Sequence, residues 1–188
     1  MRAATDGSCS QTLAVPRPAR RPHGTKRRAS LAKVLTGGQS GADRAATDAA
    51  LACGIAYGGW VPRGGWAEDF PTPPGVLVAY PDFTESPSED LAVRTVRNVD
   101  DADGLLVVWI APGTSRGSDL ALGRAVQLGK PLATIDVRSD EAGSQLEALL
   151  ARLGPHCTLN IAGPRESEQP GIYAAARRFF EANLGLVR

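Results

Sequence analysis

The most constraining feature of this sequence lies at residues 34–44, where a glycine-rich turn follows a short apolar segment and precedes a helix-forming segment. The stretch reads Val-Leu-Thr-Gly-Gly-Gln-Ser-Gly-Ala-Asp-Arg. We interpret it as a short buried strand, a tight turn and the first turn of a helix. Glycines let the backbone approach a ligand closely, and the amides and dipole at a helix N-terminus favour an anion. The stretch therefore predicts an anion site, most often one for phosphate. A turn that serves packing alone is the alternative.

A second turn of the same kind follows the apolar run at residues 105–110. It reads Ala-Pro-Gly-Thr-Ser-Arg-Gly-Ser at residues 111–118. The apolar run does not alternate, which is typical of a parallel strand covered on both faces. Ligands of open α/β sheets bind at the carboxyl ends of the strands, so the two turns can converge on one ligand if their strands are neighbours.

The rest of the pattern alternates between strands and helices. Helices are predicted at 42–53, from about 88 to 99, and at 118–128, 141–153 and about 170–184, and further strands at 55–60, 131–136 and 158–161. Ser86 or Ser88 is expected to cap the helix ending near Val99, with Arg94 and Arg97 on its more exposed side. The predicted fold class is α/β, a mostly parallel sheet with helices on both faces.

The connection at residues 61–87 is long and rich in proline. Long loops in compact domains are usually functional or disordered. Arg63, Glu68 and Asp69 lie in or beside it and suit a polar ring system, although the two acids are equally well read as a solvated pair. A dinucleotide site would need an acid where Trp60 stands and a different glycine spacing, so NAD is disfavoured.

The first 30 residues differ in composition from the remainder. They hold seven Arg or Lys against one acid, which leaves 14 basic and 19 acidic residues in the rest. We expect residues 1–30 to be a disordered basic extension and 31–188 to be the folded ligand-binding domain. An organellar transit peptide, a nucleic-acid or membrane arm and a passive extension are open interpretations, and we favour the last.

Composition excludes several classes of function. The acidic balance of the folded part argues against nucleic-acid binding, and nothing is long and apolar enough to span a membrane. Cys9, Cys53 and Cys157 have no metal or redox spacing, so no metal ligands are predicted. Their odd number and the lack of a secretory signal indicate a reducing cytoplasm.

Four blocks of the sequence resemble the molybdenum cofactor carrier proteins. They are residues 36–45, 58–64 and 67–69, and Asn-Ile-Ala-Gly-Pro-Arg-Glu-Ser at 160–167. The resemblance covers about residues 32–184. It implies a Rossmann-like fold related to the lysine-decarboxylase-like phosphoribohydrolases, a homo-oligomer (dimer or tetramer), and binding and protection of the molybdenum cofactor without turnover. Molybdoenzymes or cofactor-insertion proteins would be the recipients.

The resemblance also implies a set of site residues. One of the two turns, which one being left open, would hold the phosphate through backbone amides, with Ser118 or Thr114 donating hydroxyl hydrogen bonds. Asn160 and Arg165 would meet molybdate or phosphate oxygens. Glu68 or Asp69 would read the amino-pyrimidine edge of the pterin. The cofactor's dithiolene holds the metal, so no Cys or His ligands are needed. The expected cofactor-binding residues are Gly37, Gly38, Gln39, Ser40, Gly41, Arg44, Arg63, Glu68, Asp69, Gly113, Thr114, Gly117, Ser118, Asn160, Gly163 and Arg165.

Two alternatives share the fold. One is a nucleotide-processing enzyme, an N-glycosidic hydrolase like the phosphoribohydrolases, and the other is a nucleotide-sensing domain. The enzyme relatives are expected to carry PGGxGTxxE at the second turn, whose acid does the hydrolytic work. Here only Asp119 offers a carboxylate, and not at the enzyme position. No catalytic residue is therefore predicted.

Overall fold

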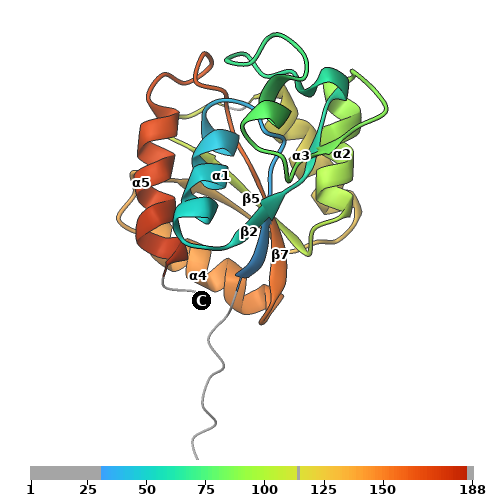
Figure 1. The fold of residues 1–188 in the computed structure, drawn as a ribbon. Helices are drawn as coiled ribbons and strands as arrows, with labels where there is room; N and C mark the ends of the chain where they lie inside the picture. Colours follow the sequence, from blue (N-terminus) through green and yellow to red (C-terminus); the bar gives the residue numbers. More distant parts are fainter. Residues whose placement is uncertain (1–30, 114, 186–188) are drawn as a thin grey trace, which may run out of the picture.

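A parallel five-stranded sheet forms the centre of the protein (Figure 1). The computed structural model describes residues 31–113 and 115–185. The strand order is β2-β1-β7-β5-β6, and each pairing is parallel. The strands are β1 Leu31–Leu35, β2 Ala56–Gly58, β5 Gly104–Trp109, β6 Leu132–Asp136 and β7 Cys157–Ala162. The predicted α/β class is confirmed, and the non-alternating run at 105–110 is an interior strand beside the central β7.

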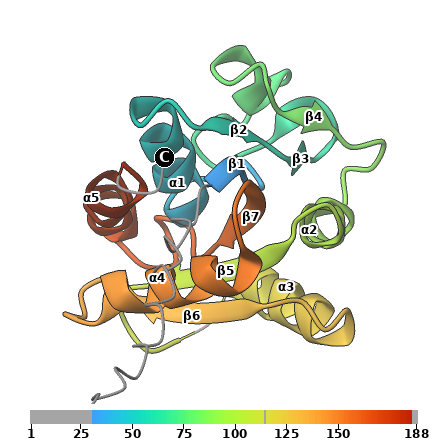
Figure 2. The ribbon, with the colours of Figure 1, turned by 90° about the horizontal axis from the view of Figure 1, so that it is seen from below.

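Helices cover both faces of this sheet. The helices are α1 Ala42–Ala52, α2 Leu91–Asp100, α3 Arg116–Gln127, α4 Ala142–Leu153 and α5 Ile172–Leu184. Along β5, Leu106 and Val108 join the larger core with α1, α4 and α5, while Leu105 and Val107 join a smaller core with α2 and α3. Figure 2 shows α1 beside α5 and α2 beside α3 on opposite sides of the sheet. Successive side chains of a strand point to opposite faces of the sheet, so neighbouring residues of β5 belong to different cores.

The segment between β2 and α2 departs from the predicted strand at 55–60. That strand ends at Gly58, and β3 Trp60–Val61 pairs instead with β4 Thr84–Glu85 in a separate two-stranded sheet. Asn98 explains the break, because its side chain bonds both backbone groups of Trp60, at 2.7 and 3.0 Å. Two short 3-10 turns, η1 Arg63–Gly65 and η2 Gly75–Val78, fill the long connection between β3 and β4.

Two helix starts were misplaced by the sequence pattern. Asp90, and neither Ser86 nor Ser88, caps α2 by accepting a hydrogen bond from the Ala92 amide at 2.9 Å. At α3, the Ser115 hydroxyl accepts from the Ser118 amide at 3.2 Å, so the helix begins at Arg116. This start places Gly117 and Ser118 inside the first helical turn, with their backbone at the positive end of the helix dipole.

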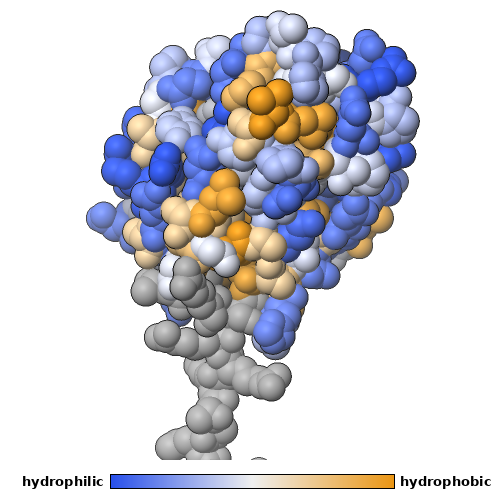
Figure 3. Space-filling view, in the orientation of Figure 1, coloured by the Kyte–Doolittle hydropathy of each residue, from blue (hydrophilic) through white to orange (hydrophobic). Residues whose placement is uncertain are grey.

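The face of the molecule drawn in Figure 3 is largely hydrophilic, with apolar areas over α1 and over the region of η2. These elements contain Leu51 and Val78, which are 50% and 71% exposed. Single exposed apolar side chains of this kind are common on protein surfaces. Within residues 31–113 and 115–185, the helices are too short or too polar to cross a membrane.

Gly41 offers a test of the glycine turn. Its φ is +73°, and a Cβ there would lie 2.5 Å from the Pro164 carbonyl oxygen and 2.6 Å from the Glu166 amide nitrogen. Gly171, the N-cap of α5, also has positive φ, +90°, but open space around it. We expect Gly171→Ala to cost about 1–2 kcal/mol of unfolding free energy from backbone strain alone.

Gly41→Ala should cost about 3 kcal/mol or more, because a backbone clash is added to the strain. Urea denaturation of the two variants beside the parent protein measures both values. Equal losses in the two variants would contradict the close approach of the glycine turn to residues 164–166.

Candidate functional site

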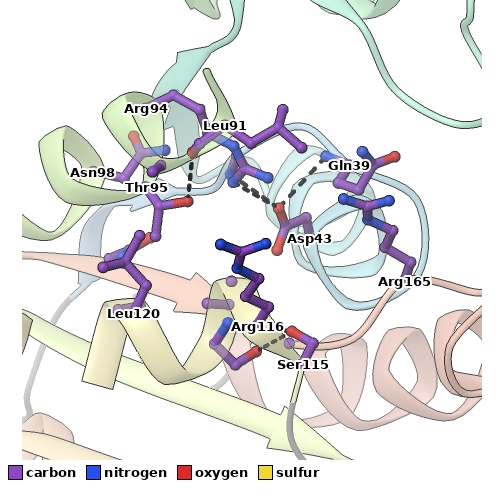
Figure 4. A pocket seen from close by; sticks show the side chains of 18 of the residues that line it. Gln39, Asp43, Leu91, Arg94, Thr95, Asn98, Ser115, Arg116, Leu120 and Arg165 are labelled. Carbon is purple, nitrogen blue, oxygen red and sulfur yellow. Dashed lines mark hydrogen bonds and ion pairs between the residues drawn. The ribbon is translucent and has the colours of Figure 1, made fainter. Parts of the chain in front are cut away.

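A cavity of about 370 Å³ opens at the carboxyl ends of β1, β5 and β7 (Figure 4). One wall is the glycine turn with the start of α1, and the others are the first turns of α2 and α3 and the loop after β7. The lining residues are Gly37, Gln39, Asp43, Asp90, Leu91, Ala92, Arg94, Thr95, Asn98, Ser115, Arg116, Gly117, Ser118, Leu120, Ala121, Asn160, Ile161, Ala162, Gly163, Arg165 and Glu168. The volume lies in the range of small-molecule sites, roughly 300–1,000 Å³.

Three guanidinium groups point into this cavity from three different elements. Arg94 comes from α2, Arg116 from α3 and Arg165 from the loop after β7 (Figure 4). The Arg94 side chain is only 13% exposed, and burial lowers the pKa of its guanidinium. Arg165 also lies over the Trp66 ring, 5.4 Å from its centroid. Arginine remains charged in proteins, so the three groups bring positive charge to a partly enclosed space.

Buried donors without partners also lie at the cavity. Nε2 of Gln39 and Nε of Arg94 have no hydrogen-bond partner among the described residues. Gln39 as a residue is 3% exposed, and its Oε1 already accepts from the amides of Ser40 and Glu68. Buried donors are normally satisfied, and an unsatisfied one costs about 1–3 kcal/mol. Two residues of the cavity lining thus carry donor atoms that are closed off from solvent and unsatisfied within the described protein.

Asp43 is the buried acid of the cavity, at 5% exposure. Its Oδ2 accepts hydrogen bonds from the amides of Gly37 and Gln39, at 3.1 and 3.4 Å, and lies 3.6 Å from the Arg94 guanidinium. Burial raises the pKa of Asp43, while Arg94 and the two amides oppose that rise. The Asp43 carboxylate thus accepts hydrogen bonds from two of the backbone amides that the sequence pattern predicts to bind a phosphate.

Other amides of the glycine turn are also bonded within the protein. Gly38 donates to the Thr36 hydroxyl at 3.2 Å, Ser40 to its neighbour Gln39 at 3.0 Å, and Ala42 to the Pro164 carbonyl at 3.1 Å. The turn is therefore a closed wall of the cavity. The first turns of α2 and α3 present their positive ends to the same space.

Two further acids lie at the rim of the cavity and are exposed. Asp90 caps α2, and Glu168 accepts a hydrogen bond from the Arg165 amide at 2.9 Å. With Asp43 they balance the formal charge of the three arginines. Each acid is already bonded to backbone amides, whereas Arg116 and Arg165 at the opening have no carboxylate partner within ion-pair distance among the described residues. The opening therefore favours an anion.

Arg44 lies behind the cavity wall. It bonds both carboxylate oxygens of Asp69, at 2.7 and 3.3 Å, and the Gly38 carbonyl at 3.2 Å. Its guanidinium lies over the rings of both Phe70 and Tyr80, 4.9 Å from each centroid. These contacts hold the long connection against the glycine turn, so Arg44 and Asp69 stabilise the fold at this point.

Glu68 joins three loops at a single carboxylate. It accepts hydrogen bonds from the hydroxyl of Ser40, and from the amide and hydroxyl of Ser167 at 3.2 and 2.6 Å. Burial raises the pKa of Glu68, but the hydrogen bonds from Ser167 and Ser40 outweigh it and hold the pKa below its usual value. The glycine turn, the long connection and the loop after β7 are thereby fixed to one another.

The residues expected from the sequence divide into three groups. Those that line the cavity are Gly37, Gln39, Gly117, Ser118, Asn160, Gly163 and Arg165. Those that do not line it are Gly38, Ser40, Gly41, Arg44, Arg63, Glu68, Asp69 and Gly113. Thr114 lies outside the described residues. Arg63 borders a separate, more open hollow and pairs with Glu89 at 2.9 Å.

Sequence reasoning missed Asp43, Arg94, Thr95, Asn98 and Arg116 as cavity residues. Arg94 was expected on the more exposed side of its helix, and that expectation is wrong because the guanidinium pairs with Asp43 in the interior. Arg116 stands inside the second glycine turn, and its position there was the available signal. Nothing in the local pattern of α2 shows that Arg94 faces another element.

The fold is that of a Rossmann-like α/β protein, and its cavity at the carboxyl edge of the sheet is lined by three arginines. Known proteins then give the family. The chain belongs to the circularly permutated YpsA SLOG family, whose model matches residues 34–184.

A crystal structure from Syntrophus aciditrophicus, at 1.45 Å resolution, is similar to this chain and bears the name "Putative molybdenum carrier protein". It is 37% identical, the match covers 86% of this chain and 99% of that one, and the TM-score is 0.74. A comparison with curated proteins gives no significant match. The resemblance seen in the four sequence blocks is thus confirmed at the level of the family.

Glu68 gives a pH-dependent test of the loop junction. A carboxyl group whose pKa is lowered by folding stabilises the protein above its unfolded pKa of 4.5, and this contribution is lost as the pH falls through the folded pKa. We expect Glu68→Gln to be destabilised at pH 7, with the difference from the parent shrinking below pH 4.5. Urea denaturation at a series of pH values measures the difference.

Glu89→Gln is the matched control for this variant. Glu89 is 74% exposed in its pair with Arg63, and exposed pairs contribute little. A pH-independent difference for Glu68→Gln, or one no larger than in the control, would count against the junction.

Proposed function

We propose that this protein binds, protects and delivers the molybdenum cofactor as a non-catalytic carrier. The name of the similar crystal structure supports the ligand, and the cavity supports the chemistry. The observation that carries the proposal is the set of three arginines, Arg94, Arg116 and Arg165, that line one cavity from α2, α3 and the loop after β7.

The residues of the cavity fit the molybdenum cofactor. A terminal phosphate needs several donors, and those at the start of α3 are the Arg116 guanidinium, a hydroxyl of the bonded pair Ser115 and Ser118, and the backbone amides of Arg116 and Gly117 ahead of the capped Ser118 amide. The other donors, Gln39, Arg94 and Arg165, suit the oxygens at the metal end. Among the described residues no group of three or more His, Cys, Asp or Glu side chains is placed to hold a metal. A cofactor that brings its own dithiolene ligands requires none from the protein.

The carboxylates are arranged in a way that favours a carrier over a hydrolase. Glu68 is bonded to Ser40 and Ser167 outside the cavity, and Asp119 is exposed on α3 and does not line it. Asp43, Asp90 and Glu168 do line it, but Asp43 is held by two backbone amides and Arg94, and the other two each accept a hydrogen bond from a backbone amide. A general acid or base works by exchanging a proton with the substrate, and these contacts oppose that exchange.

Shielding of the ligand is expected from the walls of the cavity, which come from the glycine turn, the first turns of α2 and α3 and the loop after β7. Glu68 joins the glycine turn to the loop after β7, so a bound pterin would be screened from water and oxidants on several sides. We propose a homo-oligomeric, cytoplasmic carrier that passes its ligand to molybdoenzymes or cofactor-insertion proteins.

The direct experiment purifies the protein under anaerobic conditions and releases its ligand by oxidation. Fluorescence and mass of a phosphorylated pterin in the released material, together with slower loss of free cofactor activity in an apo-enzyme reconstitution assay, are the expected results. Absence of both would overturn the carrier function. Release of base from nucleoside monophosphates would favour the hydrolase instead.

Arg116 should contribute directly to affinity. Arg116→Ala removes a guanidinium at the cavity opening without disturbing the core, so we expect cofactor binding to weaken about 10-fold or more. Arg63→Ala is the control, because Arg63 was equally suggested by the sequence but lies outside the cavity. Equilibrium binding of the phosphorylated pterin to both variants measures the effect. Equal affinities for the two variants would place the anion elsewhere.

A further inference from the structure

We propose that Asp43 determines the specificity of the cavity. On this assignment, one oxygen of its carboxylate closes the glycine turn to phosphate, and the other accepts a hydrogen bond from an N–H donor on the ring of the ligand. The proposal rests on the proposed function, because it says how the same cavity distinguishes a phosphorylated heterocycle from a simple anion.

First, Oδ2 of Asp43 is already bonded to the glycine turn. The amides of Gly37 and Gln39 both donate to this atom, at 3.1 and 3.4 Å, and Arg94 lies 3.6 Å from it. A phosphate oxygen in the turn would have to displace the carboxylate from both amides and from its counter-ion. The two negative groups would also repel each other at short distance in a poorly hydrated place. Phosphate is therefore directed to the far side of the cavity, at α3.

The second step is the position of Oδ1. The bonds of the carboxylate to the turn and to Arg94 all use Oδ2. Figure 4 shows the second oxygen turned away from the turn, toward the open middle of the cavity. Asp43 is 5% exposed and lines the cavity, so this oxygen is an acceptor that a ligand can reach and bulk water scarcely does.

The third step is the surroundings of this acceptor. Arg94, Arg116 and Arg165 face it from α2, α3 and the loop after β7, and Arg44 lies behind it on α1. The other acids of the cavity, Asp90 and Glu168, lie at the rim. A carboxylate acceptor faced by guanidinium donors forms a mixed edge, which matches a ring carrying N–H and C=O groups side by side.

The cavity therefore has two different ends, which together set the orientation of a ligand that carries both a ring and a phosphate. The ring lies toward α1, where Asp43 and Gln39 face it, and the phosphate lies toward α3 and Arg116. The expected class is a phosphomonoester of an amino-oxo pyrimidine-type ring, as in a pterin or a guanine. Inorganic phosphate, and phosphate esters without N–H donors, form hydrogen bonds only at the α3 end of the cavity.

The test exchanges the acceptor for a donor of the same shape. In Asp43→Asn the amide oxygen can still accept from Gly37 and Gln39, while an NH₂ group takes the place of Oδ1. We expect the affinity for a 6-substituted pterin phosphomonoester to fall about 10-fold, and the affinity for inorganic phosphate to stay equal or rise because a negative charge is lost. Asp48→Asn is the control, since Asp48 is on the same helix, side chain 17% exposed, but outside the cavity.

A second measurement needs no variant. The parent protein should bind the pterin ester about 10-fold tighter than 1-naphthyl phosphate, a bicyclic ester without N–H donors, and the gap should shrink in Asp43→Asn. Equal affinity for the two esters in the parent, or equal loss for pterin ester and inorganic phosphate in the variant, overturns the role of Asp43. Tight pterin binding without any dependence on Asp43 leaves the carrier function standing, whereas binding of phosphate but not of GMP or the pterin ester overturns both proposals.

Discussion

The buried pair of Asp43 and Arg94 is the interaction on which the arrangement of the site depends. Two charges are costly to bury unless they meet each other and further hydrogen bonds. Here the backbone amides of the glycine turn complete the pair. The Arg94 guanidinium occupies the space that a Cβ of residue 37 would need, so glycine at this position admits α2 to the turn. The glycine turn is thus shaped for a helix of the same protein.

Asn98 fixes the same helix one turn further along. It donates to the Thr36 carbonyl at 3.1 Å and exchanges hydrogen bonds with both backbone groups of Trp60. Together with the ion pair, these bonds hold α2 across the end of β1. The first turns of α2 and α3 then face the same cavity, and α3 adds Arg116 to it. Positive charge at the site therefore comes from how two helices are docked, as well as from the side chains they carry.

Much of the fold could be predicted from the sequence. Alternating apolar runs and helix signals were sufficient for the parallel sheet, the helices on both faces and the position of the cavity at the carboxyl edge. The misplaced features share one cause. Asp90 as the cap of α2, the break after Gly58 and the inward Arg94 all depend on contacts between segments distant in the sequence. Local patterns contain no information on such contacts.

The candidate site was predictable only in part, for a related reason. Arg44, Glu68 and Asp69 look like ligand-binding groups because they are charged and stand in distinctive blocks, yet they bind other parts of the protein. Glu68 alone links three of the four blocks, through Ser40 and Ser167. These blocks therefore supply both the outer support of the cavity and part of its lining, including Gln39, Asp43 and Arg165. Arg94 and Arg116, which face its interior, lie outside them.

The four blocks and the first turns of α2 and α3 therefore contribute differently to the site. Proteins that share the four blocks would share the junction at Glu68 and the closed glycine turn, and hence a cavity in the same place. Within that shared frame, which includes Asp43, what the cavity accepts depends further on the side chains at the first turns of α2 and α3. In this chain those positions supply guanidinium groups opposite a buried carboxylate. A ligand with an anionic end and a hydrogen-bonding ring satisfies both sides at once, and a ligand with only one of the two leaves a buried polar group without a partner.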